Sequence, residues 1–288
     1  MKNNFAACVI LYNPKKEDIA NILSYVNKVK KVYVFDNTES KSNENLFQNF
    51  ENVSYYWDNE NKGIAIRLNE GCKKAIAENF DYLLTMDQDS SFLEENIDQY
   101  FNDILNFKEK DKVAVYGLEY DKVTKNVNKD NITFLKKDHL ITSASVMNLN
   151  LYNNIGGFDE NLFIDGVDID YCYAAMSKGY ENIEFQNNFF QHSLGEPVRR
   201  GTIYTLFLFK KNKTLHSTTR IYYMYRNMLY LENKYKLIFP KLVIDLKRRY
   251  LRHINKSIKY SVNIFEAYKF KRKAFKDFKN NKMGKIKL

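Results

Sequence analysis

Two carboxylates with one residue between them, Asp87 and Asp89, follow directly on the largely apolar segment 82–86. Burying an unpaired carboxylate is costly, so a positive partner is expected here. Carboxylate oxygens are the ligands that Mg²⁺ and Mn²⁺ prefer. Solvated loop acids explain the Asp-x-Asp spacing taken alone, but its position directly after a strand makes a metal site an equal alternative.

A second acidic group, Asp165, Asp168 and Asp170, lies in "FIDGVDIDYC" soon after the pair Gly156-Gly157. Acids at the start of a helix are stabilised by its free N–H groups and its macrodipole. One carboxylate would satisfy that need, so this group suggests that at least one of its members is present for chemistry.

The elements that must position these acids alternate between strand and helix through the first half of the chain. Apolar runs predict strands at residues 5–11, 31–36, 52–57 and 80–87, and helical spacing predicts helices at 15–29 and 63–79. This order predicts an α/β fold with a parallel sheet covered on both faces. Ligands bind such sheets at the carboxyl ends of their strands, where Asp36 and Asp87 lie.

The second half is less regular. It predicts strands at 113–121, 131–137, 181–186 and 188–192, a short helix before Gly156-Gly157, and a helix at 168–180. After about Ser217 the pattern is helical, tyrosine-rich and then basic.

Composition limits the class of protein. In 288 residues, 15% aromatic content indicates a folded chain, and three distant cysteines favour a reducing compartment over a disulfide framework. No apolar run is long enough to span a membrane, so we expect a soluble or peripheral protein. The net charge of +10 comes from the tail, since residues 241–288 hold 16 Lys and Arg against 3 Asp and Glu.

Seven segments, in order, resemble family 2 inverting glycosyltransferases of the GT-A fold, most closely bacterial rhamnosyltransferase-like enzymes of polysaccharide assembly. They are "VILYNP", "VYVFDNTES", "NKGIAIRLNEG", "LLTMDQDSSF", "LITSASVMNLNLYNNIGGFDENLFIDGVDIDYC", "QHSLG" and "RIYYMYRNMLYL". The resemblance runs from Val9 to about Tyr235. It implies a GT-A, Rossmann-like sheet flanked by helices, followed by a helical, basic carboxyl-terminal extension.

The resemblance implies roles in nucleotide-sugar binding for Tyr12, Asn13, Asp36, Asn61, Gly63, Asn69 and Asp87. Asp36 matches the acid that reads the nucleobase edge, and Asn61, Gly63 and Asn69 match a segment that lines the nucleotide pocket. A capping acid and an ordinary helix-entry turn remain the alternatives for these positions.

The resemblance also implies a divalent cation, Mg²⁺ or Mn²⁺, held by Asp87, Asp89 and His192 against the donor diphosphate. A structural role remains open for a lone histidine. Asp168 matches the family's general base. The usual preceding Glu is replaced by Val167, so Asp165 shares the candidate role, while Asp170 fits better as a helix-start acid.

The implied organisation is a catalytic domain at 1–216, with a nucleotide-binding half at 1–90 and an acceptor and base half at 91–216. Residues 217–288 would form the helical, basic region. The implied partners are a UDP or dTDP sugar, rhamnose favoured, and a saccharide or lipid-linked acceptor. The basic tail further suggests a cytoplasmic enzyme held at the inner face of an anionic membrane, with a subunit contact as the alternative.

Two other classes fit less well. A basic tail with interleaved aromatic residues could bind nucleic acid, but the rest of the chain is slightly acidic, with its acids at strand ends. A sugar nucleotidyltransferase would carry a glycine-rich loop after the first strand, where this chain reads "YNPKKED". No P-loop, HExxH or GxSxG motif is present.

Overall fold

The computed structural model describes residues 4–120, 133–192, 198–200, 210–213 and 215–287. The chain forms two compact units, the first from Met1–Glu160 with Val167–Ser193 and the second from Asn161–Gly166 with Leu194–Leu288. The expected domain boundary after residue 216 stays a prediction.

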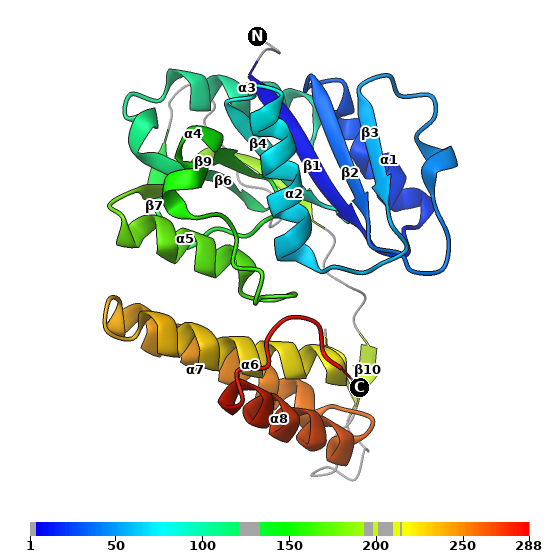
Figure 1. Ribbon diagram of the computed structural model, residues 1–288, viewed down its shortest axis with the longest axis vertical. Helices are drawn as coiled ribbons and strands as arrows, with labels where there is room; N and C mark the ends of the chain where they lie inside the picture. The colour runs from blue at the N-terminus through cyan, green and yellow to red at the C-terminus, as the bar shows by residue number, and fades with distance from the viewer. Residues whose placement is uncertain (1–3, 121–132, 193–197, 201–209, 214, 288) are drawn as a thin grey trace. The chain divides into compact units, whose positions relative to one another are not determined.

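The first unit is built on a mixed sheet of nine strands in the order β3-β2-β1-β4-β8-β6-β9-β5, with β7 paired to β9 (Figure 1). Its strands are β1 (Phe5–Leu11), β2 (Lys31–Asp36), β3 (Val53–Trp57), β4 (Tyr82–Asp87), β5 (Ser90–Ser91), β6 (Val113–Tyr120), β7 (Phe134–Lys136), β8 (Ser145–Asn148) and β9 (Glu181–His192). The four amino-terminal strands β1 to β4 are parallel, and β6 is parallel to β9. The α/β class and the mostly parallel sheet are therefore confirmed.

Helices cover both faces of this sheet. They are α1 (Lys16–Val26), α2 (Ile64–Ala77), α3 (Glu94–Asn106), α4 (Leu149–Ile155) and α5 (Val167–Ser177), with 3₁₀ turns η1 (Glu44–Leu46) and η2 (Lys110–Lys112). Helix α1 packs beside α3, whereas α2 and α5 each pack beside α4 (Figure 1). Helix α2 lies close to β1 because Gly71 has no side chain: a Cβ there would lie 2.8 Å from Cys8 Sγ.

The core of the first unit lies between the sheet and these helices. β1 is a continuous buried apolar strand, as expected for a parallel strand covered on both faces. All three cysteines, Cys8, Cys72 and Cys172, are buried free thiols.

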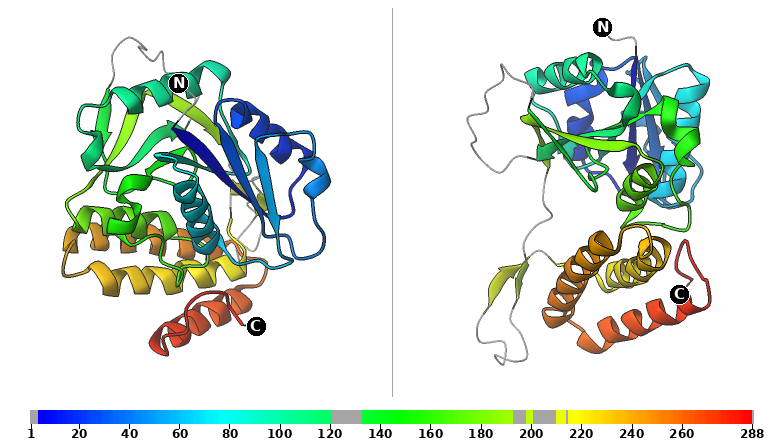
Figure 2. Two further views of the ribbon diagram at one scale, coloured as in Figure 1. Left: turned by 45° about the horizontal axis from the view of Figure 1, so that its top comes forward. Right: turned by 90° about the vertical axis from the view of Figure 1, so that its left-hand side faces the viewer.

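The second unit contains three mutually packed helices, α6 (Thr218–Tyr235), α7 (Pro240–Lys259) and α8 (Ile264–Lys279) (Figure 2). Strands β10 (Val198–Arg200) and β11 (Lys211–Lys213) form a separate antiparallel pair. The Ser217 side chain caps α6 by accepting a hydrogen bond from Arg220 N at 3.2 Å, so the expected helical start at this point is confirmed. Ile221 and Met224 of α6 are buried against Ile254 and Ile258 of α7.

Three details differ from the expectations. The predicted strands at 181–186 and 188–192 are one strand, β9, whose register against β6 shifts between Phe185 and Phe189. β8 lies antiparallel between β4 and β6, and α3 follows the acidic loop; neither was predicted. Residues 121, 131 and 132 of the predicted strands lie outside the described residues.

Within the described part of the chain, no helix combines the length and the apolar character that crossing a bilayer requires.

Candidate active site

The candidate site lies at the carboxyl edge of the parallel strands. In the register of the sheet, Leu11 lies opposite Asp36 on β2, and Ile10 lies opposite Asp87 on β4. The end of β1 therefore lies between the two acids, and Tyr12 directly follows it. This edge is where open α/β sheets bind their ligands.

Asp87, Asp89 and His192 come together here, as predicted. Each offers a ligand atom, and these atoms lie within 4.8 Å of one another. β5 pairs with β9 so that Ser90 lies opposite His192, which brings a residue 102 positions away to the acidic loop. His192 Nδ1 lies 3.4 Å from Asp89 Oδ1 and 2.7 Å from Ser90 Oγ.

The donor set fits a divalent cation. Two carboxylates and one imidazole supply hard oxygens and one nitrogen, a combination suited to Mn²⁺ and compatible with Mg²⁺. The side chains remain accessible, with exposed fractions of 40% for Asp89 and 19% for His192. Among the residues that the structure describes, this is the only such group of three.

Gln88, between the two acids, is a residue that the sequence analysis overlooked. Its Oε1 accepts a hydrogen bond from Tyr12 N at 2.7 Å, and its backbone oxygen accepts one from Asn21 Nδ2 at 2.9 Å. Gln88 therefore holds the acidic loop against the end of β1 and against α1. Its position within the Asp-x-Asp motif was the signal that could have identified it.

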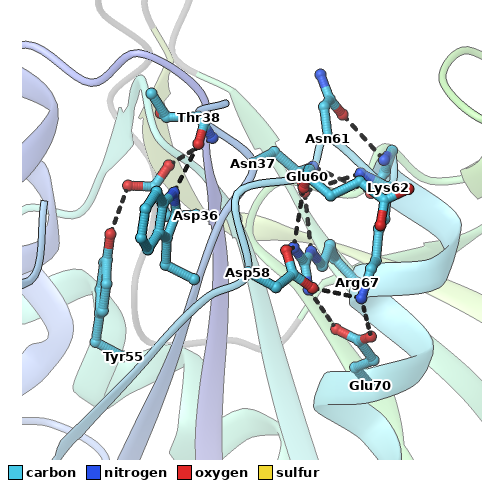
Figure 3. A network of polar contacts seen from close by, with 12 residues as sticks. Asp36, Asn37, Thr38, Tyr55, Asp58, Glu60, Asn61, Lys62, Arg67 and Glu70 are labelled. Atoms are coloured by element: carbon cyan, nitrogen blue, oxygen red, sulfur yellow. Dashed lines mark hydrogen bonds and ion pairs between the residues drawn. The ribbon is translucent and has the colours of Figure 1, made fainter. Parts of the chain in front are cut away.

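Asp36 is fully buried at the end of β2, and its carboxylate accepts three hydrogen bonds, of which those from Thr38 and Tyr55 are drawn in Figure 3. The donors are Thr38 N at 2.8 Å, Asn43 Nδ2 at 2.7 Å and Tyr55 Oη at 2.8 Å. Burial raises the pKa of Tyr55 to about 12, so its hydroxyl stays protonated and donates to Asp36 at neutral pH. Asp36 thus fixes the loop after β2, and its contact with a nucleobase stays a prediction.

The loops after β1 and β2 are joined to each other. Asn13, with a φ of 48°, donates its backbone N–H to Thr38 Oγ1 at 2.8 Å. Trp57 Nε1 donates to the backbone oxygen of Thr38 at 2.7 Å. Tyr12 is 49% exposed and is accessible at this edge.

Arg67, also absent from the predicted site, organises the loop before α2 (Figure 3). Its buried guanidinium forms ion pairs with Asp58 at 2.5 Å and with Glu70 at 2.9 Å. Its Nε donates a hydrogen bond to Asn37 Oδ1 at 2.9 Å. Burial disfavours the charged form of Asp58, but hydrogen bonds from Arg67 and Lys62 outweigh it and lower the pKa of Asp58 to about 2.

Asn61 and Gly63 lie in this loop and shape the entry to α2. Asn61 Oδ1 accepts a hydrogen bond from Gly63 N at 3.0 Å, and Gly63 O accepts one from Asn37 Nδ2 at 3.2 Å. Gly63 has a φ of 82°, which glycine adopts without strain. Their nucleotide contacts stay predictions.

Asn69 is more deeply buried than its predicted role in lining the nucleotide pocket requires. Its Oδ1 accepts hydrogen bonds from Tyr152 Oη at 2.6 Å and Phe158 N at 2.8 Å. Its Nδ2 donates to Phe158 O and to Glu160 Oε1, both at 2.9 Å. Asn69 is 5% exposed and joins α2 to the turn after α4. Its hydrogen-bonding capacity is already used within the protein.

The two candidate bases have different surroundings. Asp168 lies in the first turn of α5, where its Oδ1 accepts a hydrogen bond from Ile169 N at 2.9 Å. Asp165 belongs to the second unit and is paired with Arg220, whose Nη2 lies 3.0 Å from Asp165 Oδ1. Asp170, 1% exposed, is buried. Residues 193–195 of the "QHSLG" motif lie outside the described residues.

Comparison with known proteins follows this geometry. No family model matches the chain. It is 23% identical over 290 residues to the dTDP-rhamnosyl transferase RfbF of Shigella flexneri, covering 90% of this chain and 94% of that protein. The sequence resemblance to rhamnosyltransferases is thus confirmed.

Among solved structures, GalNAc-T7 with UDP, GalNAc and Mn²⁺ matches 96% of this chain with a TM-score of 0.60 and 11% identity. S. aureus TarS 1-349 in complex with UDP-GlcNAc matches 96% with a TM-score of 0.53 and 12% identity. The chain has the GT-A fold. It spans 92% of that TarS chain and 56% of the GalNAc-T7 chain.

The GT-A fold explains why the candidate residues gather where they do. Its parallel half places Asp36 and Asp87 at one edge, and the later strand β9 returns to bring His192 beside Asp89. Asp168, on α5 of the same unit, lies outside this metal cluster.

Proposed function

We propose that this chain is a metal-dependent, inverting glycosyltransferase that uses a nucleoside-diphosphate sugar. The observation that carries the proposal is the cluster of Asp87, Asp89 and His192 at the carboxyl edge of a GT-A sheet. Rhamnose is the favoured sugar because RfbF is named a dTDP-rhamnosyl transferase. Galactose, glucose and N-acetylhexosamines remain alternatives.

Asp87, Asp89 and His192 would hold the divalent cation, Mg²⁺ or Mn²⁺. When bound, such a cation neutralises the charge that builds on a departing diphosphate. The chain's own residues prepare the site, since Gln88 fixes the acidic loop to the end of β1. Tyr12, Asn13, Asp36, Asn61 and Gly63 would line the nucleotide-sugar pocket.

Asp168 would act as the general base. The acceptor hydroxyl oxygen forms a bond to the anomeric carbon while the bond from that carbon to the diphosphate oxygen breaks on the opposite face. The hydroxyl proton passes to the Asp168 carboxylate, and the configuration inverts in one step. Asp168 is favoured because it matches the family's general base, and Asp165, which is paired with Arg220, is the alternative.

The acceptor would be a saccharide or a lipid-linked saccharide. An enzyme with a lipid-linked acceptor benefits from a position at the membrane surface, and residues 241–288 supply basic side chains for an anionic one. We therefore propose peripheral association with the cytoplasmic face, with a subunit contact as the alternative use of this region.

The experiment that tests the proposal is release of nucleoside diphosphate from a panel of UDP and dTDP sugars, with Mn²⁺ or Mg²⁺ and a saccharide acceptor. One donor should be consumed, and both EDTA and Asp89→Ala should abolish turnover. Asp98→Ala is a matched control, since Asp98 is an exposed acid of α3 that is paired with Lys28 and lies outside the candidate metal cluster. Full turnover in EDTA would refute the metal dependence, and no turnover with any donor would refute the activity.

A further inference from the structure

The second unit contains an open cavity of about 910 Å³ formed by residues of α6, α8 and the segment after α8. Its lining is dominated by basic side chains: Lys271, Arg272, Lys273, Lys276 and Lys282. One acid, Asp277, also lines it. We call this feature, which lies entirely within the second unit, the basic groove.

The single acid does not neutralise the groove. Asp277 accepts a hydrogen bond from Tyr222 Oη at 2.8 Å and pairs with Lys273 at 3.2 Å. Burial disfavours its charged form, but these hydrogen bonds outweigh it and lower the pKa of Asp277, so the pair is ionised at neutral pH. Asp277 therefore balances Lys273, which leaves Arg272, Lys276 and Lys282 as exposed cations.

Exposed apolar side chains accompany these cations on α8. Phe265, Tyr268 and Phe275 are exposed by 89%, 53% and 46%, and Tyr268 and Phe275 also line the groove. Their spacing places them on one face of the helix together with Arg272. Val262, just before α8, is 82% exposed.

We propose that the basic groove binds the phosphate groups of anionic lipid headgroups, while the exposed apolar side chains of α8 enter the membrane interface. Helices that lie on a membrane combine these two features: basic residues for the headgroups and an apolar face that inserts. Nucleic acid fits this surface less well than a membrane does. The exposed aromatic rings could stack on bases, but the exposed Val262 has no ring with which to stack.

Helix α7 provides the contrast. Its exposed apolar residue Ile244 is followed by Asp245, and no residue of α7 lines the groove. The basic charge of the region is therefore shared by α7 and α8, but α8 supplies most of the groove lining and the exposed apolar face. This assignment rests on the proposed membrane association and names the surface responsible for it.

The test is co-sedimentation of the full chain with vesicles of phosphatidylglycerol and phosphatidylcholine, compared with phosphatidylcholine alone. Arg272→Gln with Lys276→Gln removes two exposed groove cations, and Lys241→Gln with Arg252→Gln removes two exposed cations from α7. Because the groove variant loses two headgroup contacts, its partitioning into anionic vesicles should be about 10- to 30-fold weaker than that of the wild type. The partitioning of the α7 variant should fall much less. Phe265→Ser should also weaken binding, whereas Leu237→Ser, at a 90% exposed position before α7, should not.

Each outcome decides the proposal. Equal loss in the groove and α7 variants would show diffuse attraction and overturn the groove as the site. Release by inorganic phosphate at constant ionic strength would identify a free phosphate ligand instead, and selective loss of oligonucleotide binding in the groove variant would identify nucleic acid. If the wild-type chain did not bind anionic vesicles, the proposed membrane association would be refuted. The proposed transferase activity would not be affected, because donor turnover is measured in a separate assay. Thermal unfolding of each variant checks that it is folded.

Discussion

The partner of each carboxylate determines what that carboxylate can do. Asp168 accepts a hydrogen bond from the amino-terminal turn of its own helix, whereas Asp165 is held by the Arg220 guanidinium. Asp36 is surrounded by three donors, and Asp89 remains accessible beside His192. Four acids at predicted positions therefore have four different environments.

Replacing Asp168 with Asn should lower the turnover rate by about 10² to 10⁴ fold, because the amide keeps the size of the side chain but cannot accept the proton. Binding of the donor should be unchanged. Steady-state rates and donor titrations measure the two quantities, and Asp165→Asn is the matched control. An inactive Asp165→Asn beside a nearly wild-type Asp168→Asn would reverse the assignment.

Asp58 should contribute to stability only above its folded pKa. The pKa falls from 3.8 to about 2 in the folded chain, so the contribution is present above about pH 4 and is lost as the pH falls toward 2. Asp58→Asn should therefore be less stable than wild type at neutral pH, and the difference should shrink across this range. Urea unfolding at a series of pH values measures it; a difference independent of pH would contradict the ion pair with Arg67.

Residue types and spacing were enough to suggest the two carboxylates of the candidate metal cluster, because Asp87 and Asp89 follow a strand directly. His192 was predicted through the family resemblance, since its distance along the chain gives no local signal. Arg67 could not be predicted as a loop organiser, because a basic residue in a helix is usually solvated, and only the fold brings Asp58 and Asn37 to it.

At the scale of elements, Asn69 joins two parts of the first unit that are distant in sequence. Its four hydrogen bonds link α2 to the backbone of Phe158 and to the side chains of Tyr152 and Glu160. The family resemblance implied that Asn69 belongs to the segment that lines the nucleotide pocket, and it said nothing of these hydrogen bonds. Which way an amide points depends on the packing of α2 against α4, and no local pattern encodes that.

Asn69→Ala should lower the free energy of unfolding by about 2 to 4 kcal/mol, because it leaves buried backbone and hydroxyl groups of Phe158 and Tyr152 without their partner. Chemical denaturation measures this loss. Donor affinity of the remaining folded enzyme distinguishes the two roles: a raised KM for the donor at unchanged stability would support direct contact with the nucleotide sugar.

The elements that the sequence did not predict share a physical cause. β8 has only four residues and is recognised as a strand by its partners β4 and β6 rather than by a long apolar run. The prediction divided β9 at Asn187, but the strand is continuous there, and the side chains of Asn187 and Asn188 donate hydrogen bonds to Asp103 Oδ2 and Asn96 O. These donor bonds lie within a continuous, irregular strand, and among the described residues the buried Oδ1 of Asn187 has no hydrogen-bond partner.

At the scale of the whole molecule, the basic charge and the chemistry lie in different compact units. The first unit carries the candidate metal cluster and Asp168, and the second carries α6 to α8 with the basic groove. The uneven charge was visible in the sequence. Which of the two basic helices carries an exposed apolar face depended on how α7 and α8 pack against α6.

Removing residues 240–288 should expose the apolar face of α6 rather than leave an intact shorter protein. Ile221 and Met224 pack in one cluster with Ile254, Ile258 and Ala267, and the deletion would remove these three partners. The shortened chain should bind a hydrophobic dye and aggregate on size-exclusion chromatography. A monomeric, dye-silent product would show that α6 does not depend on α7 and α8.

The three buried thiols can serve as native probes of local opening in this protein. Cys8, Cys72 and Cys172 lie on β1, α2 and α5 of the first unit, and burial raises the pKa of each one. A neutral, enclosed thiol does not react, so each should be alkylated only when its surroundings open. The second unit has no cysteine at all. Labelling rates read at each cysteine by mass spectrometry would thus time the opening of a strand and two helices in the catalytic unit without any engineered probe.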